Sequence, residues 1–163
     1  GGFIPDIDFN PMEFGLPPNQ LEVTEISQLL ALDVAKQAHC DAGFDSDRGF
    51  NHESTGVILG VALARQLSVP FVSRLQYPVW EKVLKSHGLS DEDTKNIVEK
   101  KNIAYTNWDT NAFPGMLGNV VAGRIANRFD FGGTNCVVDA ACASSLSALS
   151  MAISELVEHR ADM

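Results

Sequence analysis

Cys142 is the residue whose type and surroundings are best suited to chemistry in this sequence. It stands in VDAACASS, residues 138–145, after an apolar run and among small residues. The residues that follow predict an amphipathic helix over 142–158, because apolar side chains recur three and four positions apart. These are Leu146, Leu149, Ile153 and Leu156. A cysteine at a helix N-terminus lies near unpaired backbone N–H groups and the positive end of the helix dipole, and both favour the thiolate.

A short buried strand is predicted over residues 135–139, directly before this helix. Strand, two alanines, Cys142 and helix together make a strand–turn–helix elbow, the arrangement that presents a nucleophile at the end of a sheet. The small neighbours leave room for a substrate thioester, and the N–H groups at the helix start could hold an oxyanion. The elbow makes Cys142 a candidate nucleophile. Spacing alone favours packing in the core over this role, since a free cysteine beside alanine is usually a core residue.

The other two cysteines, Cys40 and Cys136, are predicted to be plain core residues. Three cysteines without a CxxC pair make neither a disulfide framework nor a zinc site, which argues against the disulfide and metal-ligand roles for Cys142. The same sparse set favours a reducing, cytoplasmic compartment.

A cysteine nucleophile usually works with a histidine. The chain has four, at His39, His52, His87 and His159. Three fall near predicted helix ends and one falls in a polar loop, and none lies in a Gly-rich loop that would present an imidazole. We therefore predict that none of the four is catalytic. Asp139, just before the elbow, is expected to hydrogen-bond at the end of the strand.

The composition is that of a soluble globular protein with room for one domain. The chain has 163 residues, 45% of them hydrophobic and 20% charged. Twenty-one acidic against twelve basic residues give a net charge of −9, which argues against nucleic acid as a partner, since nucleic-acid binding needs clustered Lys and Arg. No apolar run approaches the roughly 18 residues of a membrane span, and the first residues lack the pattern of a signal peptide.

The elements around the elbow follow from hydrophobic periodicity and stop residues. Residues 1–20 are expected to be irregular. The predicted helices cover residues 21–42 (ended by Gly43), 62–67, 77–87, 90–102 and 113–129. Between them lie a polar loop over 41–54, a buried strand over 55–60 and a turn at 132–134. The charged helices form a surface excursion near 71–112, and the small residues in 113–129 predict close packing of that helix.

Several segments resemble one known family. VVDAACASSLSAL is similar to the active-site segment of β-ketoacyl synthases, in which the nucleophilic cysteine follows Asp-(Thr/Ala)-Ala. GGFIPDIDFNPMEFG, TGVILG and GNVVAGRIANRFDFGGTN resemble segments that precede it in modular ketosynthases. GLPPNQLEVTEISQLLALDVAKQA and ISELVEHRADM look most like the ketosynthase of bacterial polyunsaturated fatty acid synthases. The resemblance covers nearly all of residues 1–163, and the excursion also looks like this subfamily.

The resemblance implies an α/β, thiolase-like fold with layers αβαβα, of which this chain is part of the N-terminal half. It implies that Cys142 accepts an acyl chain from an acyl carrier protein, that a malonyl thioester on the carrier loses CO₂, and that its carbanion attacks. It implies a homodimer of the complete domain and no metal or organic cofactor. It assigns three residues to the acyl pocket: Val61 aligns with a position that lines it, and Phe113 and Leu117 fall in the segment that often approaches the pocket of the partner subunit. Core packing is the alternative for each.

The chain departs from the family in ways that affect activity. Neither of the family's histidine motifs, His-Gly-Thr and Asn-Ile-Gly-His, occurs here, and the accompanying lysine is also missing. The family's first strand is absent before Gly1, and the chain stops at Met163. We therefore expect the C-terminal half to be elsewhere, in a longer protein or a separate chain. The alternatives are a ketosynthase of a polyketide or enediyne synthase, or a catalytically silent dimerisation scaffold.

Overall fold

Two short parallel strands stand at the centre of the fold. The computed structural model describes residues 1–44, 49–62 and 65–163. Strand β1 (Val57–Gly60) pairs with β2 (Asn135–Val138) in the register Val57 to Asn135 through Gly60 to Val138. Both strands were predicted, and both begin and end within two residues of the expected positions. Because they are parallel, their carboxyl ends meet at one edge of the sheet.

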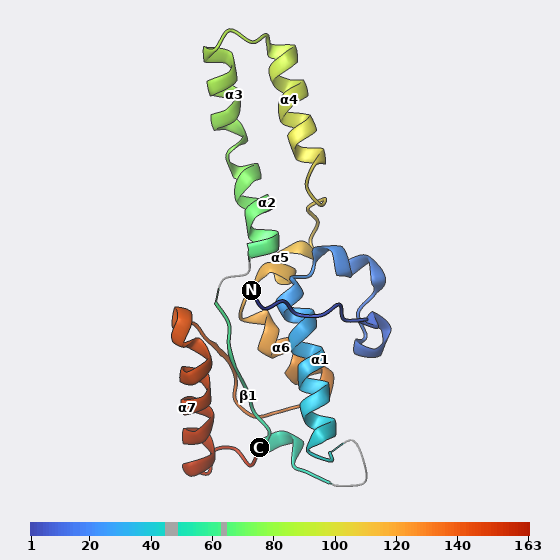
Figure 1. The fold of residues 1–163 in the computed structure, drawn as a ribbon, viewed down its shortest axis with the longest axis vertical. Coiled ribbons are helices and arrows are strands. Elements are labelled where there is room, and N and C mark those ends of the chain that lie inside the picture. Colours follow the sequence, from blue (N-terminus) through green and yellow to red (C-terminus); the bar gives the residue numbers. More distant parts are fainter. Residues whose placement is uncertain (45–48, 63–64) are drawn as a thin grey trace.

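Helices cover both faces of these strands (Figure 1). Helices α1 (Ile26–Asp41) and α6 (Val120–Phe129) pack on one face, and α7 (Ser144–Val157) packs on the other. Side chains alternate along the strands accordingly. Val57, Leu59 and Val137 contact the α1–α6 side, whereas Cys136 points towards Met151 of α7.

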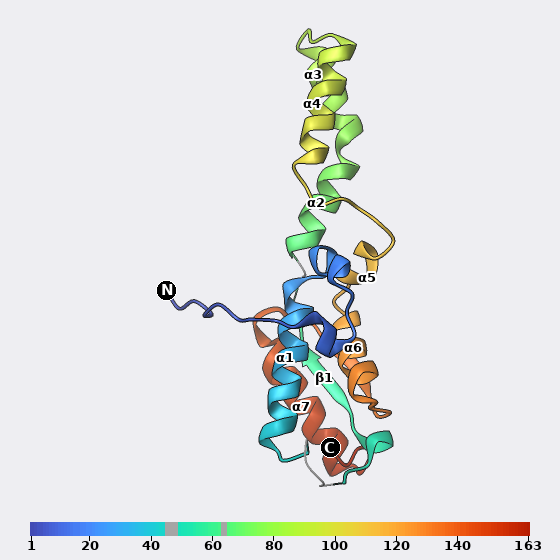
Figure 2. The ribbon, with the colours of Figure 1, turned by 90° about the vertical axis from the view of Figure 1, so that its right-hand side faces the viewer.

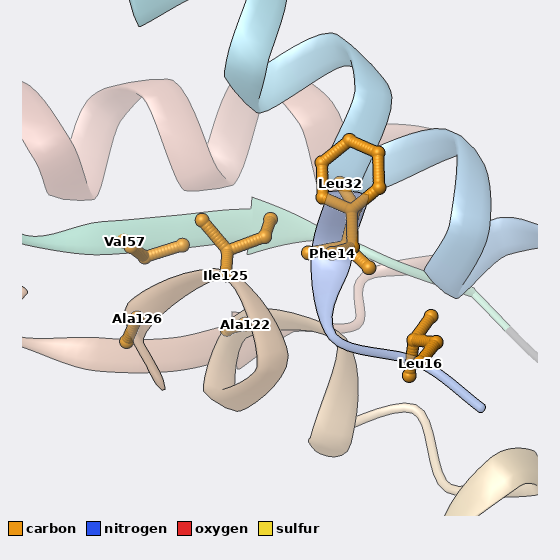
Figure 3. Close-up of a cluster of buried hydrophobic side chains, with 7 residues drawn as sticks. All are labelled: Phe14, Leu16, Leu32, Val57, Ala122, Ile125 and Ala126. Carbon is orange, nitrogen blue, oxygen red and sulfur yellow. The ribbon is translucent and has the colours of Figure 1, made fainter. Parts of the chain in front are cut away.

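The core lies between α1, α6 and the strands (Figure 3). It consists of Phe14, Leu16, Leu32, Val57, Ala122, Ile125 and Ala126. The small side chains of α6 lie against β1, and Ala122 is fully buried. The close packing predicted from the small residues of this helix is therefore confirmed. Phe14 and Leu16 come from the N-terminal segment, which is otherwise irregular over residues 1–10 and forms two 3₁₀ turns, Pro11–Phe14 and Pro18–Val23.

The single helix predicted over 113–129 is wrong, because the chain breaks it into α5 (Ala112–Met116) and α6. Two donors from the start of α1 meet this break: the Glu25 N–H donates to the Gly115 carbonyl at 2.9 Å, and Gln28 adds its side-chain amide. Its side-chain Nε2 donates to the backbone carbonyls of Pro114, Gly115 and Leu117 at 3.0, 2.8 and 3.3 Å. Carbonyls at the C-terminal end of a helix need a donor from outside that helix. A residue nearly 90 positions earlier therefore caps α5, and Leu117 takes an extended conformation.

Three helices form an arm that projects from the layered part (Figures 1 and 2). They are α2 (Arg65–Leu75), α3 (Tyr77–Ser86) and α4 (Asp91–Ile103). The predicted boundaries of α3 and α4 are confirmed, with Gly88 at φ +85° and the Ser90 side chain capping α4. Helix α2 is longer than the short helix predicted over 62–67, and residues 63–64 of that prediction lie outside the described residues. That residues near 71–112 form a surface excursion of the ketosynthase domain stays a prediction.

The first helix and its loop differ slightly from expectation. Helix α1 starts at Ile26 rather than at residue 21, because residues Pro18–Val23 form a 3₁₀ turn first. Gly43, at φ +78°, follows the end of α1 as predicted. Within the loop predicted over 41–54, residues His52–Ser54 make a 3₁₀ turn, and residues 45–48 lie outside the described part. Of the helices in the described ranges, none is long and apolar enough to cross a membrane.

Candidate active site at the end of strand β2

Cys142 lies at the carboxyl edge of the sheet, in the turn that joins β2 to α7. The residues Ala141–Ala143 form a 3₁₀ turn, and α7 begins at Ser144. The expected helix start at Cys142 is therefore two residues too early, because Ala140 and Ala141 do not adopt helical angles before it. The strand–turn–helix elbow itself is present. Cys142 is exposed, whereas Cys40 and Cys136 are half-buried.

Ser144 fixes the shape of this elbow. Its buried hydroxyl donates to the Ala141 carbonyl at 2.7 Å and accepts from the Ala140 N–H at 2.9 Å. Asp139 adds a second fixed point, since its Oδ1 accepts from the Ala141 N–H at 3.0 Å. Asp139 therefore has the hydrogen-bonding role predicted for it. Two backbone N–H groups next to Cys142 are satisfied by side chains of the elbow.

The backbone of the elbow is strained at Ala141. Its φ is +49°, in the left-handed region that favours glycine over residues with a Cβ. Such conformations persist where surrounding contacts hold them, and they concentrate at functional sites. Here the contacts are the hydrogen bonds from the Ala141 N–H and to the Ala141 carbonyl. The strain is located one residue before Cys142.

Strand β1 touches the elbow at Gly60. A Cβ at this position would lie 2.6 Å from the Ser144 carbonyl carbon and 2.7 Å from the Ser145 nitrogen. Only glycine fits, because backbone atoms on the other side leave no space for a side chain. The Val61 N–H then donates to the Val138 carbonyl at 3.1 Å, which continues the pairing beyond the strands. β1 therefore sets where α7 starts.

The backbone N–H of Cys142 has no hydrogen-bond partner in the described part of the chain, in contrast to its neighbours at 140, 141 and 143. A free N–H beside a thiol is suited to accept the negative charge that develops on a carbonyl oxygen when that thiol attacks. Thiol and donor thus come from one residue at an open turn.

The four histidines lie away from Cys142 in this structure. His39 contacts the rings of Phe129 and Phe131 near the amino end of β2, with ring centroids 5.8 and 6.1 Å away. The His52 ring lies in the same cluster. Four residues of strand, about 13 Å, separate that end from the elbow.

The remaining two histidines are at other extremities. His159 follows the far end of α7, whose 14 residues span about 21 Å. His87 follows α3 at the outer end of the arm. None of the four imidazoles is therefore in place to exchange a proton with Cys142. Within the described ranges, no three His, Cys, Asp or Glu side chains converge on a possible metal site.

The three residues assigned to the acyl pocket are only partly brought together. Val61 is half-buried directly after β1. Leu117 is half-buried at the break between α5 and α6, and an added Cβ at Gly118 would lie 3.8 Å from Val61 Cγ1, so this break adjoins Val61. Phe113 is 52% exposed on α5. The pocket role of the three stays a prediction.

Helix α7 buries a different stripe from the one that its sequence pattern suggests. Ser144, Ala148 and Glu155 are buried against the strands. The apolar side chains that predicted an amphipathic helix are exposed, namely Leu146, Leu149, Ile153 and Leu156. The helix thus leaves its large apolar side chains on the open face, and it buries two small residues and the Glu155 carboxylate on the covered face.

Sequence reasoning missed Ser144, Ala141 and Gly60 as parts of the site. Ser144 lies within the quoted elbow, and a serine three residues after an alanine pair is a usable sign of a turn that is pinned by a hydroxyl. Gly60 could have been flagged, since a glycine at the end of a buried strand often marks close approach of another backbone. Nothing in the residue type of Ala141 predicts a positive φ.

The family profile described as "Beta-ketoacyl synthase, N-terminal domain" matches residues 1–163. The chain belongs to the β-ketoacyl synthase family. The predicted α/β, thiolase-like fold is confirmed by this membership and by the mixed helices around a parallel sheet. The sequence of the elbow around Cys142 was the motif that most specifically predicted this family.

Similar proteins are large synthases. The chain is 45% identical over 163 residues to a polyunsaturated fatty acid synthase subunit of Thraustochytrium sp., covering all of this chain and 6% of that protein. It is 30% identical over 164 residues to polyketide synthase PksN of Bacillus subtilis, covering all of this chain and 2% of that protein. It is 28% identical over 148 residues to polyketide synthase 2 of Metarhizium anisopliae, covering 91% of this chain and 5% of that protein.

Proposed function

We propose that this chain supplies the nucleophile of a β-ketoacyl synthase, with Cys142 as the residue that carries the growing acyl chain. The observation that carries the proposal is the elbow itself: an exposed thiol on a turn fixed by Ser144, beside the N–H of the same cysteine, which no described residue accepts from. The contrast with half-buried Cys40 and Cys136 supports the assignment to Cys142.

The first step of the proposed reaction is acyl transfer. The Cys142 sulfur attacks the carbonyl carbon of an acyl thioester on an acyl carrier protein, and the Cys142 N–H donates to the carbonyl oxygen as it becomes negative. The bond to the carrier sulfur breaks, the carrier thiol takes up the proton, and an acyl thioester on Cys142 remains. The open surface of the elbow, which has only small residues next to Cys142, suits the approach of a carrier-bound thioester.

The second step is decarboxylative condensation. A malonyl thioester on the carrier loses CO₂, and the electron pair left on its α-carbon attacks the acyl carbonyl on Cys142. A carbon–carbon bond forms, the Cys142 sulfur leaves, and a β-ketoacyl chain two carbons longer stays on the carrier. We propose that residues outside this chain promote the decarboxylation, because all four histidines here lie away from the elbow.

We propose synthesis of polyunsaturated fatty acids as the setting of this reaction. The support is the 45% identity with a synthase named for that product, against 30% and 28% identity with polyketide synthases. A polyketide ketosynthase is the second candidate, since the same elbow serves both. We also propose a cytoplasmic homodimer of the complete domain, with the C-terminal half as the partner that covers the exposed stripe of α7.

The test is a condensation assay on the complete protein that carries this sequence. Acyl and malonyl thioesters of a carrier protein are supplied, and the β-ketoacyl product and CO₂ are measured. The wild type and a Cys136→Ala control are expected to form product, while Cys142→Ala is expected to form none. Product from Cys142→Ala would overturn the nucleophile assignment. No product from a folded wild type would favour a catalytically silent scaffold.

A further inference from the structure

A cavity of about 340 Å³ lies on the side of the molecule opposite α7, between the N-terminal segment and α6. Arg124, Asn127 and Arg128 of α6 line it, and Gln20 lines it from the 3₁₀ turn Pro18–Val23. Core side chains including Leu32 complete the wall. Its volume is at the lower end of the range for small-molecule sites, and its polar groups are nitrogen-rich side chains.

The two arginines of this cavity have no carboxylate partner in the described part of the chain. Arg124 uses its Nε to donate to the Gln28 Oε1 at 2.5 Å, and its Nη1 and Nη2 have no partner among the described residues. Arg128 donates through Nη2 to the backbone carbonyl of Glu13. The Glu13 carboxylate itself pairs with Lys36. Two guanidinium groups are therefore left without a counter-charge, in a chain whose net charge is −9.

The placement of these two charges is unfavourable unless something negative lies near them. They stand four positions apart on α6, the spacing at which like charges on a helix face each other and repel. Arg124 is half-buried, and burial lowers its pKa from the usual value, which is the response of a cation that has lost water without gaining a counter-charge. An anion between the two guanidinium groups would relieve both effects.

The donor set favours an oxyanion. Guanidinium groups present planar pairs of N–H donors that match the oxygens of phosphate or carboxylate, and the Asn127 amide adds two further neutral donors at the same wall. Two cations and an amide nitrogen on one wall suit a doubly charged group better than a singly charged one.

We propose that this cavity binds a small phosphate-bearing anion between Arg124 and Arg128. The site is separate from the elbow, because the sheet lies between α6 and α7, so it does not depend on the proposed role of Cys142. Asn127 contributes its amide, and the hydrogen bond from Arg124 to Gln28 holds the first guanidinium in place.

The test is modification of arginines by phenylglyoxal in the complete protein, mapped by mass spectrometry of peptides. Inorganic phosphate is compared with sodium chloride of equal ionic strength and with acetate. At a phosphate concentration ten times the half-protecting value, the modification of Arg124 and Arg128 should slow about tenfold by mass action. Arg74 and Arg160, which bond to Asn102 and Glu155, serve as internal controls and should react at unchanged rates.

A variant pair sharpens this result. Arg128→Gln should abolish the phosphate protection of Arg124, whereas the control Arg74→Gln should leave it intact. Any of four results would overturn the proposal: equal slowing at all four arginines, no reaction at Arg124 without phosphate, protection that survives in Arg128→Gln, or acetate protecting as well as phosphate. The wild-type measurement alone decides the matter if a variant fails to fold.

Discussion

The close contact between Gly60 and the elbow predicts that adding a single methyl group at position 60 disturbs the site. In Gly60→Ala, the new Cβ would lie 2.6 Å from the Ser144 carbonyl carbon, 2.7 Å from the Ser144 oxygen and 2.7 Å from the Ser145 nitrogen. Favourable contact between carbon atoms begins at roughly 3.5 Å, so β1 and the first turn of α7 must separate by about 0.9 Å. All three opposing atoms belong to the backbone and cannot rotate away.

Two consequences should follow from this separation. Overpacking of this kind costs about 1–3 kcal/mol in the free energy of unfolding. The start of α7 also carries the Ser144 hydroxyl that holds the elbow, so Cys142 should shift with it. A displacement near 1 Å costs up to about a hundredfold in rate when reacting groups must be aligned. We therefore expect a lower thermal midpoint and a large loss in the rate of acyl transfer to Cys142.

Gly123→Ala is the matched control, since it adds the same methyl group to α6. Its nearest neighbour would be the Asn135 Nδ2 at 3.9 Å, an ordinary contact distance, and alanine is the better helix former. Thermal unfolding and the acylation rate should be measured for both variants of the complete protein. The reasoning is refuted if Gly60→Ala unfolds at the wild-type temperature and is acylated at the wild-type rate.

Three further predictions concern the hydrogen bonds that hold the site and the layers together. Ser144→Ala should lower the free energy of unfolding by about 1–3 kcal/mol, because the Ala140 N–H loses its acceptor. Ser145→Ala, at the exposed neighbouring position, is the control and should leave the free energy of unfolding unchanged. Chemical denaturation measures both variants, and equal stability would contradict the role of Ser144 in holding the elbow. Gln28→Leu should lower the free energy of unfolding by at least about 2 kcal/mol, since it removes the donor shared by three carbonyls. Gln37→Leu on the same helix is the control, and its free energy of unfolding should stay within about 0.5 kcal/mol of the wild type. A small loss for Gln28→Leu would contradict the capping of α5. The hydrogen bond from Thr134, with help from Arg160, lowers the pKa of Glu155 below its usual value of 4.5, so its stabilising effect is present above that value and is lost as the pH falls through the lowered pKa. Unfolding followed between about pH 5 and 3 should show a steeper loss for the wild type than for Glu155→Gln, and parallel curves would disprove the effect.

Much of the local structure was predictable because its causes are local. Gly88 and Ser90 mark the turn between α3 and α4 by their own backbone and side-chain preferences. The strands follow from short apolar runs, and Cys142 stands out from its neighbours in the chain. These features need only a few consecutive residues to be recognised.

The rest depends on contacts between residues that are distant in sequence. The break after Met116 follows from Glu25 and Gln28, and the position of α7 follows from Gly60, so no periodicity within either helix could reveal them. Which face of α7 is buried depends on contacts of the same kind. Its small residues fit against the strands more closely than its leucines would, and the apolar pattern therefore describes a face that the described chain does not cover.

The most direct test of the central claim is to locate the acyl group. The complete protein is incubated with a short-chain acyl thioester of pantetheine and digested, and the masses of the peptides that contain Cys40, Cys136 and Cys142 are measured. We expect one acyl group, on Cys142 alone and removable by hydroxylamine as a thioester. Acylation of Cys40 or Cys136, or of none of the three in a folded protein, would contradict the assignment of Cys142 as the nucleophile.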